Sequence, residues 1–163
     1  MVDKLPPYAP NELLQDINNF SPAEWAHSMG SGSEELQSLA KIYQSATALY
    51  CILSLQSAFL FERSAETEAQ QFLHTERLLL LTRSFMDSSN LRHAIFWPFT
   101  VMGVAVTKRS VADREYINNQ LGRLTRLLGQ TATVVLKEAL RRFWNSGKER
   151  WDDCFDRPYC FAV

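Results

Sequence analysis

The sequence predicts an all-α fold, a single helical bundle of about six or seven helices. Apolar residues repeat every three or four positions along most of the chain, which is typical of helices with one buried face. No segment alternates apolar and polar residues as a convincing strand would. An uncharged apolar run at 95–106 is too short to cross a bilayer, which needs about 20 residues, so it belongs inside the bundle.

The run at 95–106 predicts a helix from about Pro98 to Thr107 that is apolar on every side and therefore buried as the central helix. Pro98 suits the first turn of a helix and should push Trp97 toward an extended conformation. Gly103 would let one neighbouring helix approach closely. A buried strand is the alternative, but proline and glycine both disfavour it.

The N-terminal third predicts a lead-in and two short helices. Residues 1–10 contain three prolines and read as an extended lead-in, with one domain following over residues 11–163. Asn11 should cap a short helix that carries Leu13, Leu14 and Ile17. A second helix should begin with Ser21 as its cap, Pro22 in its first turn and Glu24 at its third position, and end before Gly30.

Two long helices should follow the flexible stretch 30–33, with Ser33 capping the first of them. No glycine or proline interrupts 34–63, which predicts one helix of about 45 Å from Glu34 to Arg63. A second helix is expected from about Glu66 to Asp87. The short link at Ser64 and Ala65 predicts that the two helices pair antiparallel.

The last third predicts two more helices and an aromatic tail. Lys108 and Arg109 should end the central helix, and Ser110 should cap the next one. That helix has an apolar stripe and should stop at Gly129; its stripe is Ile117, Leu121, Leu124 and Leu128. Another helix should open at Thr131 or Thr133 and end near Gly147. The tail 150–163 should close over the bundle end or over a partner.

Charge and cysteine content narrow the class of protein. The net charge of −1 predicts no global attraction to nucleic acid or to acidic membranes. Residues 108–150 hold 10 Lys and Arg against 4 Asp and Glu, which fits either a basic face or ordinary solvated helix surfaces. The three cysteines, Cys51, Cys154 and Cys160, fit free thiols in a reducing intracellular compartment. No transmembrane segment is predicted.

No sequence motif predicts an enzyme, a metal site or a cofactor. Cysteine and histidine spacings do not match zinc ligands, and neither a Gly-x-Ser-x-Gly element nor a phosphate-binding Gly-x-x-x-x-Gly-Lys loop is present. An enzyme whose bundle encloses an apolar substrate stays as a weaker alternative. Its signature would be a deep pocket holding an acid or base with a strongly shifted pKa, with His74, His93 or Glu76 as candidates.

The chain from Trp97 onward resembles the C-terminal part of the fungal-specific transcription factor domain, the helical region found behind zinc-cluster DNA-binding modules. The resemblance covers roughly 60 to 70 residues of degenerate apolar motifs. The matching pieces are Trp97-Pro98-Phe99-Thr100-Val101-Met102-Gly103, Asp113-Arg114-Glu115-Tyr116-Ile117, Leu121-Gly122-Arg123-Leu124, Ala139-Leu140-Arg141-Arg142-Phe143-Trp144 and Arg150-Trp151-Asp152-Asp153-Cys154-Phe155.

The resemblance implies a nuclear regulatory or effector domain that receives signals or contacts partners. A zinc cluster needs six closely spaced cysteines, and this sequence has three scattered ones, so direct sequence-specific DNA binding by this chain alone is not expected. The chain would then be either a fragment of a longer factor or a stand-alone protein that kept the helical part. Val104 and Ala105 also depart from the small-acidic pair often seen there in the family.

The sequence offers a set of candidate contact residues. Its surplus of aromatic side chains is typical of apolar pockets and interface anchors, although each one could equally serve the core. They would contact a small apolar effector, a transcriptional partner protein or a second copy of the chain. The aromatic candidates are Trp97, Phe99, Trp144, Trp151, Phe155, Tyr159 and Phe161, and the polar candidates are Arg114, Arg123 and Arg126. A dimerisation or scaffold module, pairing through the long helix at 34–63, is the alternative function.

Overall fold

The computed structural model of the chain describes residues 9–30, 33–129 and 131–155. Within these residues it has eight α-helices, two short 3-10 helices and no strand, so the predicted all-α fold is confirmed. The elements are α1 (Pro10–Asn19), α2 (Pro22–Ser28), α3 (Glu34–Ser57), α4 (Ala65–Ser88), η1 (Arg92–Ile95), α5 (Phe96–Ala105), η2 (Val106–Lys108), α6 (Val111–Leu128), α7 (Thr131–Ser146) and α8 (Trp151–Cys154).

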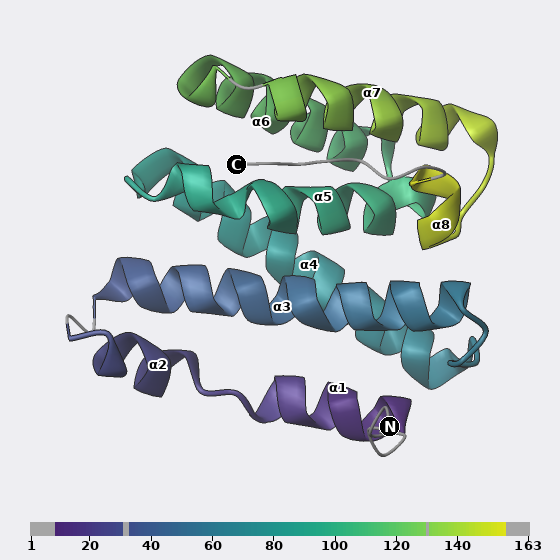
Figure 1. The fold of residues 1–163 in the computed structure, drawn as a ribbon, viewed down its shortest axis with the longest axis horizontal. Coiled ribbons are helices and arrows are strands. Elements are labelled where there is room, and N and C mark those ends of the chain that lie inside the picture. The colour runs from purple at the N-terminus through teal and green to yellow at the C-terminus, as the bar shows by residue number, and fades with distance from the viewer. Residues whose placement is uncertain (1–8, 31–32, 130, 156–163) are drawn as a thin grey trace, which may run out of the picture.

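The helices are arranged around α3, which contacts α1, α2, α4, α5 and α8. Figure 1 shows α1 and α2 along one side of α3 and α5 along the other, with α6 and α7 beyond α5. α4 returns from the end of α3 and crosses behind it. The short α8 lies at the end of the bundle where the chain turns from α3 into α4, and this junction forms the site described below.

The N-terminal helices begin close to the predicted positions. α1 starts at Pro10 with Ala9 as its N-cap, so the prediction of Asn11 as the cap is wrong. The cap at Ser21 is confirmed, because its Oγ accepts a hydrogen bond from the Glu24 amide at 3.3 Å. Ser33 caps α3 in the same way, through the Leu36 amide at 3.2 Å. The lead-in at 1–8 and residues 31–32 lie outside the described residues.

α3 ends at Ser57, so the prediction of one helix reaching Arg63 is wrong. The chain leaves the helix at Phe59, which adopts a φ of 58° in the left-handed region. The Leu60 amide then bonds back to the Leu55 carbonyl at 2.9 Å, the bond of a Schellman-type helix end. Glycine usually occupies this position, and because none is present here, no residue in the sequence marks the end of the helix.

α5 is buried along its length. It begins at Phe96, and Trp97 is helical, so the expected extended conformation of Trp97 is wrong. Pro98 is accommodated in the first turn, where amide groups have no partner within the helix. Nine of the ten residues of α5 are buried, and the helix contacts α3, α4, α6 and α7. Burial of each large aliphatic or aromatic side chain stabilises the folded state by about 1.5–3 kcal/mol, so a helix without a polar face is stable when it is enclosed in this way.

α6 begins and ends at the predicted residues, and α7 begins at one of the two predicted positions. The Ser110 side chain accepts a hydrogen bond from the Asp113 amide, and Gly129 ends α6 with a φ of 58°. The stripe residues Ile117, Leu121 and Leu124 are fully buried, while the side chain of Leu128 lies outside the described part. α7 opens at Thr131.

The described residues form one large apolar core and a smaller one. The large core joins α3, α4, α5, α6 and α7 around Phe99, Met102 and Leu140. The small core lies where α1 packs on α3, around Leu14 and Ile52. Cys51 is in the small core and Cys154 is in the large one; Cys160 lies outside the described residues.

Candidate functional site

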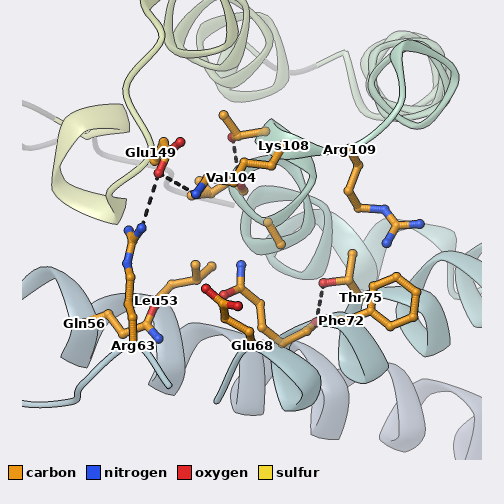
Figure 2. Close-up of a pocket in the computed structure, with 13 residues that line it drawn as sticks. Leu53, Gln56, Arg63, Glu68, Phe72, Thr75, Val104, Lys108, Arg109 and Glu149 are labelled. Carbon is orange, nitrogen blue, oxygen red and sulfur yellow. Dashed lines mark hydrogen bonds and ion pairs between the residues drawn. The ribbon is translucent and has the colours of Figure 1, made fainter. Parts of the chain in front are cut away.

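A cleft of about 410 Å³ opens where the end of α3, the first half of α4 and the end of α5 approach the loop that precedes α8. Figure 2 shows its lining side chains, with α3 and α4 forming one wall and η2 with the α7–α8 loop forming the other. The volume falls within the 300–1,000 Å³ range of small-molecule sites. The lining residues are Leu53, Gln56, Arg63, Glu68, Gln71, Phe72, Thr75, Val104, Ala105, Thr107, Lys108, Arg109 and Glu149.

One part of the cleft is apolar. Leu53 from α3 and Val104 and Ala105 from α5 reach it from the edge of the large core. Phe72 of α4 is 61% exposed, and its ring lies 5.2 Å from the guanidinium carbon of Arg109. This wall can therefore pack against the apolar part of a ligand, and that contact requires no polar side chain.

The Glu149 carboxylate joins two basic side chains across the cleft (Figure 2). Its Oε2 accepts hydrogen bonds from Lys108 Nζ at 2.7 Å and from Arg63 Nη1 at 3.2 Å. The Lys108 bond is the largest cause that lowers the pKa of Glu149; burial raises it, and the bond to Arg63 lowers it further. We call these three residues the Glu149 bridge. Two cations and one carboxylate leave it with one positive charge in excess.

The other polar groups of the cleft differ in whether they have hydrogen-bond or ion-pair partners. Arg109 is paired with Glu76 and, at 3.0 Å, with Asp113, so its charge is balanced. Gln56 Nε2 is buried and has no hydrogen-bond partner among the described residues. Buried amide donors normally find a partner, which makes this one notable. Glu68 is exposed on the α4 wall and is the negative charge that faces the bridge.

A second cleft, of about 570 Å³, adjoins the first and shares Gln56, Arg63 and Glu149 with it. The segment leading into α8 closes this side. Arg150 donates from Nη2 to the Ser57 carbonyl, and its guanidinium carbon lies 4.4 Å from the centre of the Phe59 ring. These contacts hold the α7–α8 loop, and Glu149 within it, against the end of α3.

An aromatic row runs over α3, α5 and α8. Tyr43 and Trp97 stack with ring centres 5.8 Å apart, and Tyr50 meets Trp97 at 6.0 Å and Trp151 at 5.0 Å. Phe155 follows at 4.8 Å from Trp151. Tyr43 and Tyr50 are 38% and 39% exposed, so the row reaches the surface at these two residues. Such half-exposed aromatic groups are the usual anchors of protein interfaces.

The structure separates the predicted aromatic contacts into three environments. Trp97, Trp151 and Phe155 belong to the aromatic row. Phe99 is fully buried in the large core, and Trp144 is half-buried and donates from Nε1 to the Gly103 carbonyl at 2.8 Å. Tyr159 and Phe161 lie outside the described residues.

The predicted arginines do not gather. Arg114 donates to the Arg109 carbonyl at 3.4 Å, whereas Arg123 pairs with Asp87 at 3.3 Å. Arg126 is exposed in the last turn of α6. None of the described residues among the predicted contacts lines either cleft.

The candidate acids and bases also lie apart. His74 is 3% exposed, and its pKa is lowered by burial first and by Arg77 second. His93 is exposed, and Glu76, which is paired with Arg109, does not itself line either cleft. Where residues are described, no cluster of three potential metal ligands occurs, and no helix is both long and apolar enough to span a bilayer.

Sequence reasoning missed the cleft residues. The sequence predicts Arg63 inside a helix and Lys108 as a helix-ending cation, and no motif singles out Glu149. The apolar run at 95–106 is the one sequence feature that points to this region. A chain that leaves a buried helix must return to the surface, so the residues that follow the run must lie beside neighbouring elements there. The partners that meet there depend on the tertiary fold.

Comparison with known proteins extends the resemblance over nearly the whole chain. The profile of the fungal-specific transcription factor domain matches residues 8–162. The chain is 35% identical, over 151 residues, to the phomenoic acid biosynthesis cluster-specific transcriptional regulator of Leptosphaeria maculans. That alignment covers 93% of this chain and 29% of the relative, so the chain spans less than a third of the relative's length. No solved structure matches. The chain belongs to the fungal-specific transcription factor domain family.

Proposed function

We propose that this chain is the regulatory domain of a fungal transcription regulator and acts in the nucleus by contacting other components, without reading DNA itself. The observation that carries the proposal is the family match over residues 8–162 together with the likeness to a cluster-specific transcriptional regulator. The net charge of −1 and the three scattered cysteines support a role other than direct DNA recognition.

The aromatic row is the surface that we propose for a partner protein. It combines rigid rings with two exposed tyrosines, and large aromatic groups dominate interface energies because they lose little conformational entropy on binding. Other exposed apolar side chains lie outside the aromatic row, including Leu127 on α6, which is 57% exposed.

A reporter assay tests the regulatory function. The chain is fused to an unrelated DNA-binding module, and transcription is measured from a promoter that carries the module's site. We expect output to differ from that of the module alone, and Tyr50→Ala to abolish most of the difference at equal protein level. Leu127→Ala is the matched control and should leave it unchanged. A fusion that behaves like the module alone would refute the proposal, as would sequence-specific DNA binding by the isolated chain.

A second candidate function is self-association, favoured by the outer face of α4. Leu73 and Leu80 are 57% and 71% exposed and lie two helical turns apart on this face. α3, through which the sequence predicts dimerisation, is already covered by several helices. Light scattering at increasing concentration tests this function, with Leu73→Glu expected to dissociate a dimer. A strict monomer at high concentration rules it out.

A further inference from the structure

The Glu149 bridge has more hydrogen-bond donors than acceptors. A guanidinium carries five N–H groups and an ammonium three. In this structure Arg63 and Lys108 both donate to one oxygen, Oε2 of Glu149. One further acceptor with a negative charge would balance the excess positive charge of the bridge and accept hydrogen bonds from Arg63 and Lys108.

The surroundings of the bridge restrict the apolar character, the size and the charge of a ligand. The apolar wall of Leu53, Phe72 and Val104 lies in the same cleft, so the ligand must carry an apolar body next to its charge. A volume of about 410 Å³ admits a small molecule and is too small for a folded domain. Glu68 faces the bridge from α4 and disfavours a ligand with two or more negative charges.

We propose that this cleft binds a small monocarboxylic acid with an apolar body, its carboxylate between Arg63 and Lys108 and its chain against the α3–α5 wall. The assignment rests on the proposed regulatory function, for which it names the chemical class of effector. Glu149 then acts as a competing internal carboxylate, which keeps the two cations in place while the cleft is empty and weakens ligand binding by sharing them.

Titration of the purified chain with octanoate tests this assignment, followed by amide chemical shifts, with octan-1-ol as the uncharged probe of equal chain length. We expect octanoate to shift amides around Phe72 and Val104 and to bind more tightly than octanol. Lys108→Met should weaken octanoate binding roughly five-fold, which is about what a unit charge at 4 Å supplies in a water-like medium. Arg63→Met, on the opposite wall, should act in the same direction.

Glu149→Gln separates a binding role from a structural one. If Glu149 competes with the ligand, its neutral form should bind octanoate more tightly, by a factor similar to the loss in Lys108→Met. If Glu149 only holds the cleft together, the same change should weaken binding. Lys148→Met is the matched control: Lys148 is the neighbouring cation, pairs with Asp153 at 3.8 Å and lines neither cleft, so binding should not change.

Three results would overturn the assignment: equal binding of octanoate and octanol, weaker binding in Glu149→Gln, or shifts confined to the aromatic row. Thermal unfolding of each variant shows whether it is folded before it is titrated. The titration uses the purified chain alone, so it is independent of the reporter assay. If the fusion regulates transcription but the purified chain does not bind octanoate, the effector class is refuted and the regulatory function still stands.

Discussion

The middle of α5 and the segment that leaves its C-terminal end are neighbours in sequence but differ in almost every physical respect. From Phe96 to Ala105 the chain is uncharged and nearly all of it is buried. Two and three residues after Val106, Lys108 and Arg109 reach the cleft and pair with carboxylates from other elements. The first region is held by packing in the large core, and the second by ion pairs that water can reach.

The difference shows which features a local sequence determines. A run without charge must be buried whatever its neighbours are, so the environment of α5 follows from composition. The Glu149 bridge joins Arg63 to a residue 86 positions away, and neither residue carries a local sign of the other. We therefore expect substitutions in the two regions to differ in magnitude, and in their response to pH.

Phe99→Ala should have the largest effect. Phe99 is fully buried, and its removal should lower the free energy of unfolding by about 3–5 kcal/mol through lost burial and the cavity that remains. Phe72→Ala is the matched control in the cleft region: Phe72 is 61% exposed, and its loss should change stability by only about 0.5 kcal/mol. Urea unfolding measures both, and equal effects would break the distinction between the two regions.

Gly103→Ala should come next. A Cβ at this position would overlap the end of the Leu140 side chain, and Leu140 is fully buried, so relieving the overlap would disturb the large core. Overpacking should cost about 1–3 kcal/mol, less the gain from replacing a helical glycine by alanine.

Gly122→Ala is the control for that substitution. A Cβ there would meet only Lys137 Nζ at 3.8 Å, an ordinary contact. Stability should therefore rise by about 0.5–1 kcal/mol through helix propensity alone. If both alanines stabilised the protein, close packing between α5 and α7 at Gly103 would be refuted.

Much of the fold could be predicted from the sequence because its signals are local. Ser21, Ser33 and Ser110 each cap a helix with their own side chain, and Gly129 ends one with its positive φ. The end of α3 could not be predicted, because Phe59 occupies a left-handed position where glycine is the expected residue.

The candidate site could be predicted only in part. The surplus of aromatic residues predicts Trp97, Trp151 and Phe155 as contact residues, and in the structure they form the aromatic row with tyrosines of α3. Whether they contact a partner stays a prediction. The cleft could not be predicted, because its charges come from three separate loops and helix ends, which only the packing of α3, α4, α5 and α8 brings together.

Trp144→Phe should have a smaller effect than the two core substitutions. It keeps most of the ring but removes the hydrogen bond from Nε1 to the Gly103 carbonyl, which should cost about 0.5–1.5 kcal/mol. Thermal unfolding measures the loss. A cost as large as that of Phe99→Ala would mean that Trp144 stabilises α5 mainly by packing, and not by this bond.

Glu149→Gln should have the smallest effect on stability, and that effect should depend on pH. The side chains of Arg63 and Glu149 are 46% and 39% exposed, and pairs that water reaches contribute at most about 1 kcal/mol. Because the folded protein lowers the pKa of Glu149, the bridge stabilises the fold above the ordinary glutamate value of 4.5. Its contribution is lost as pH falls through the lowered pKa, so variant and parent should differ at pH 7 and converge in acid. The Phe99→Ala difference involves no titrating group and should persist over the same range. A Glu149→Gln difference that stayed constant with pH would show that the bridge contributes packing and not charge.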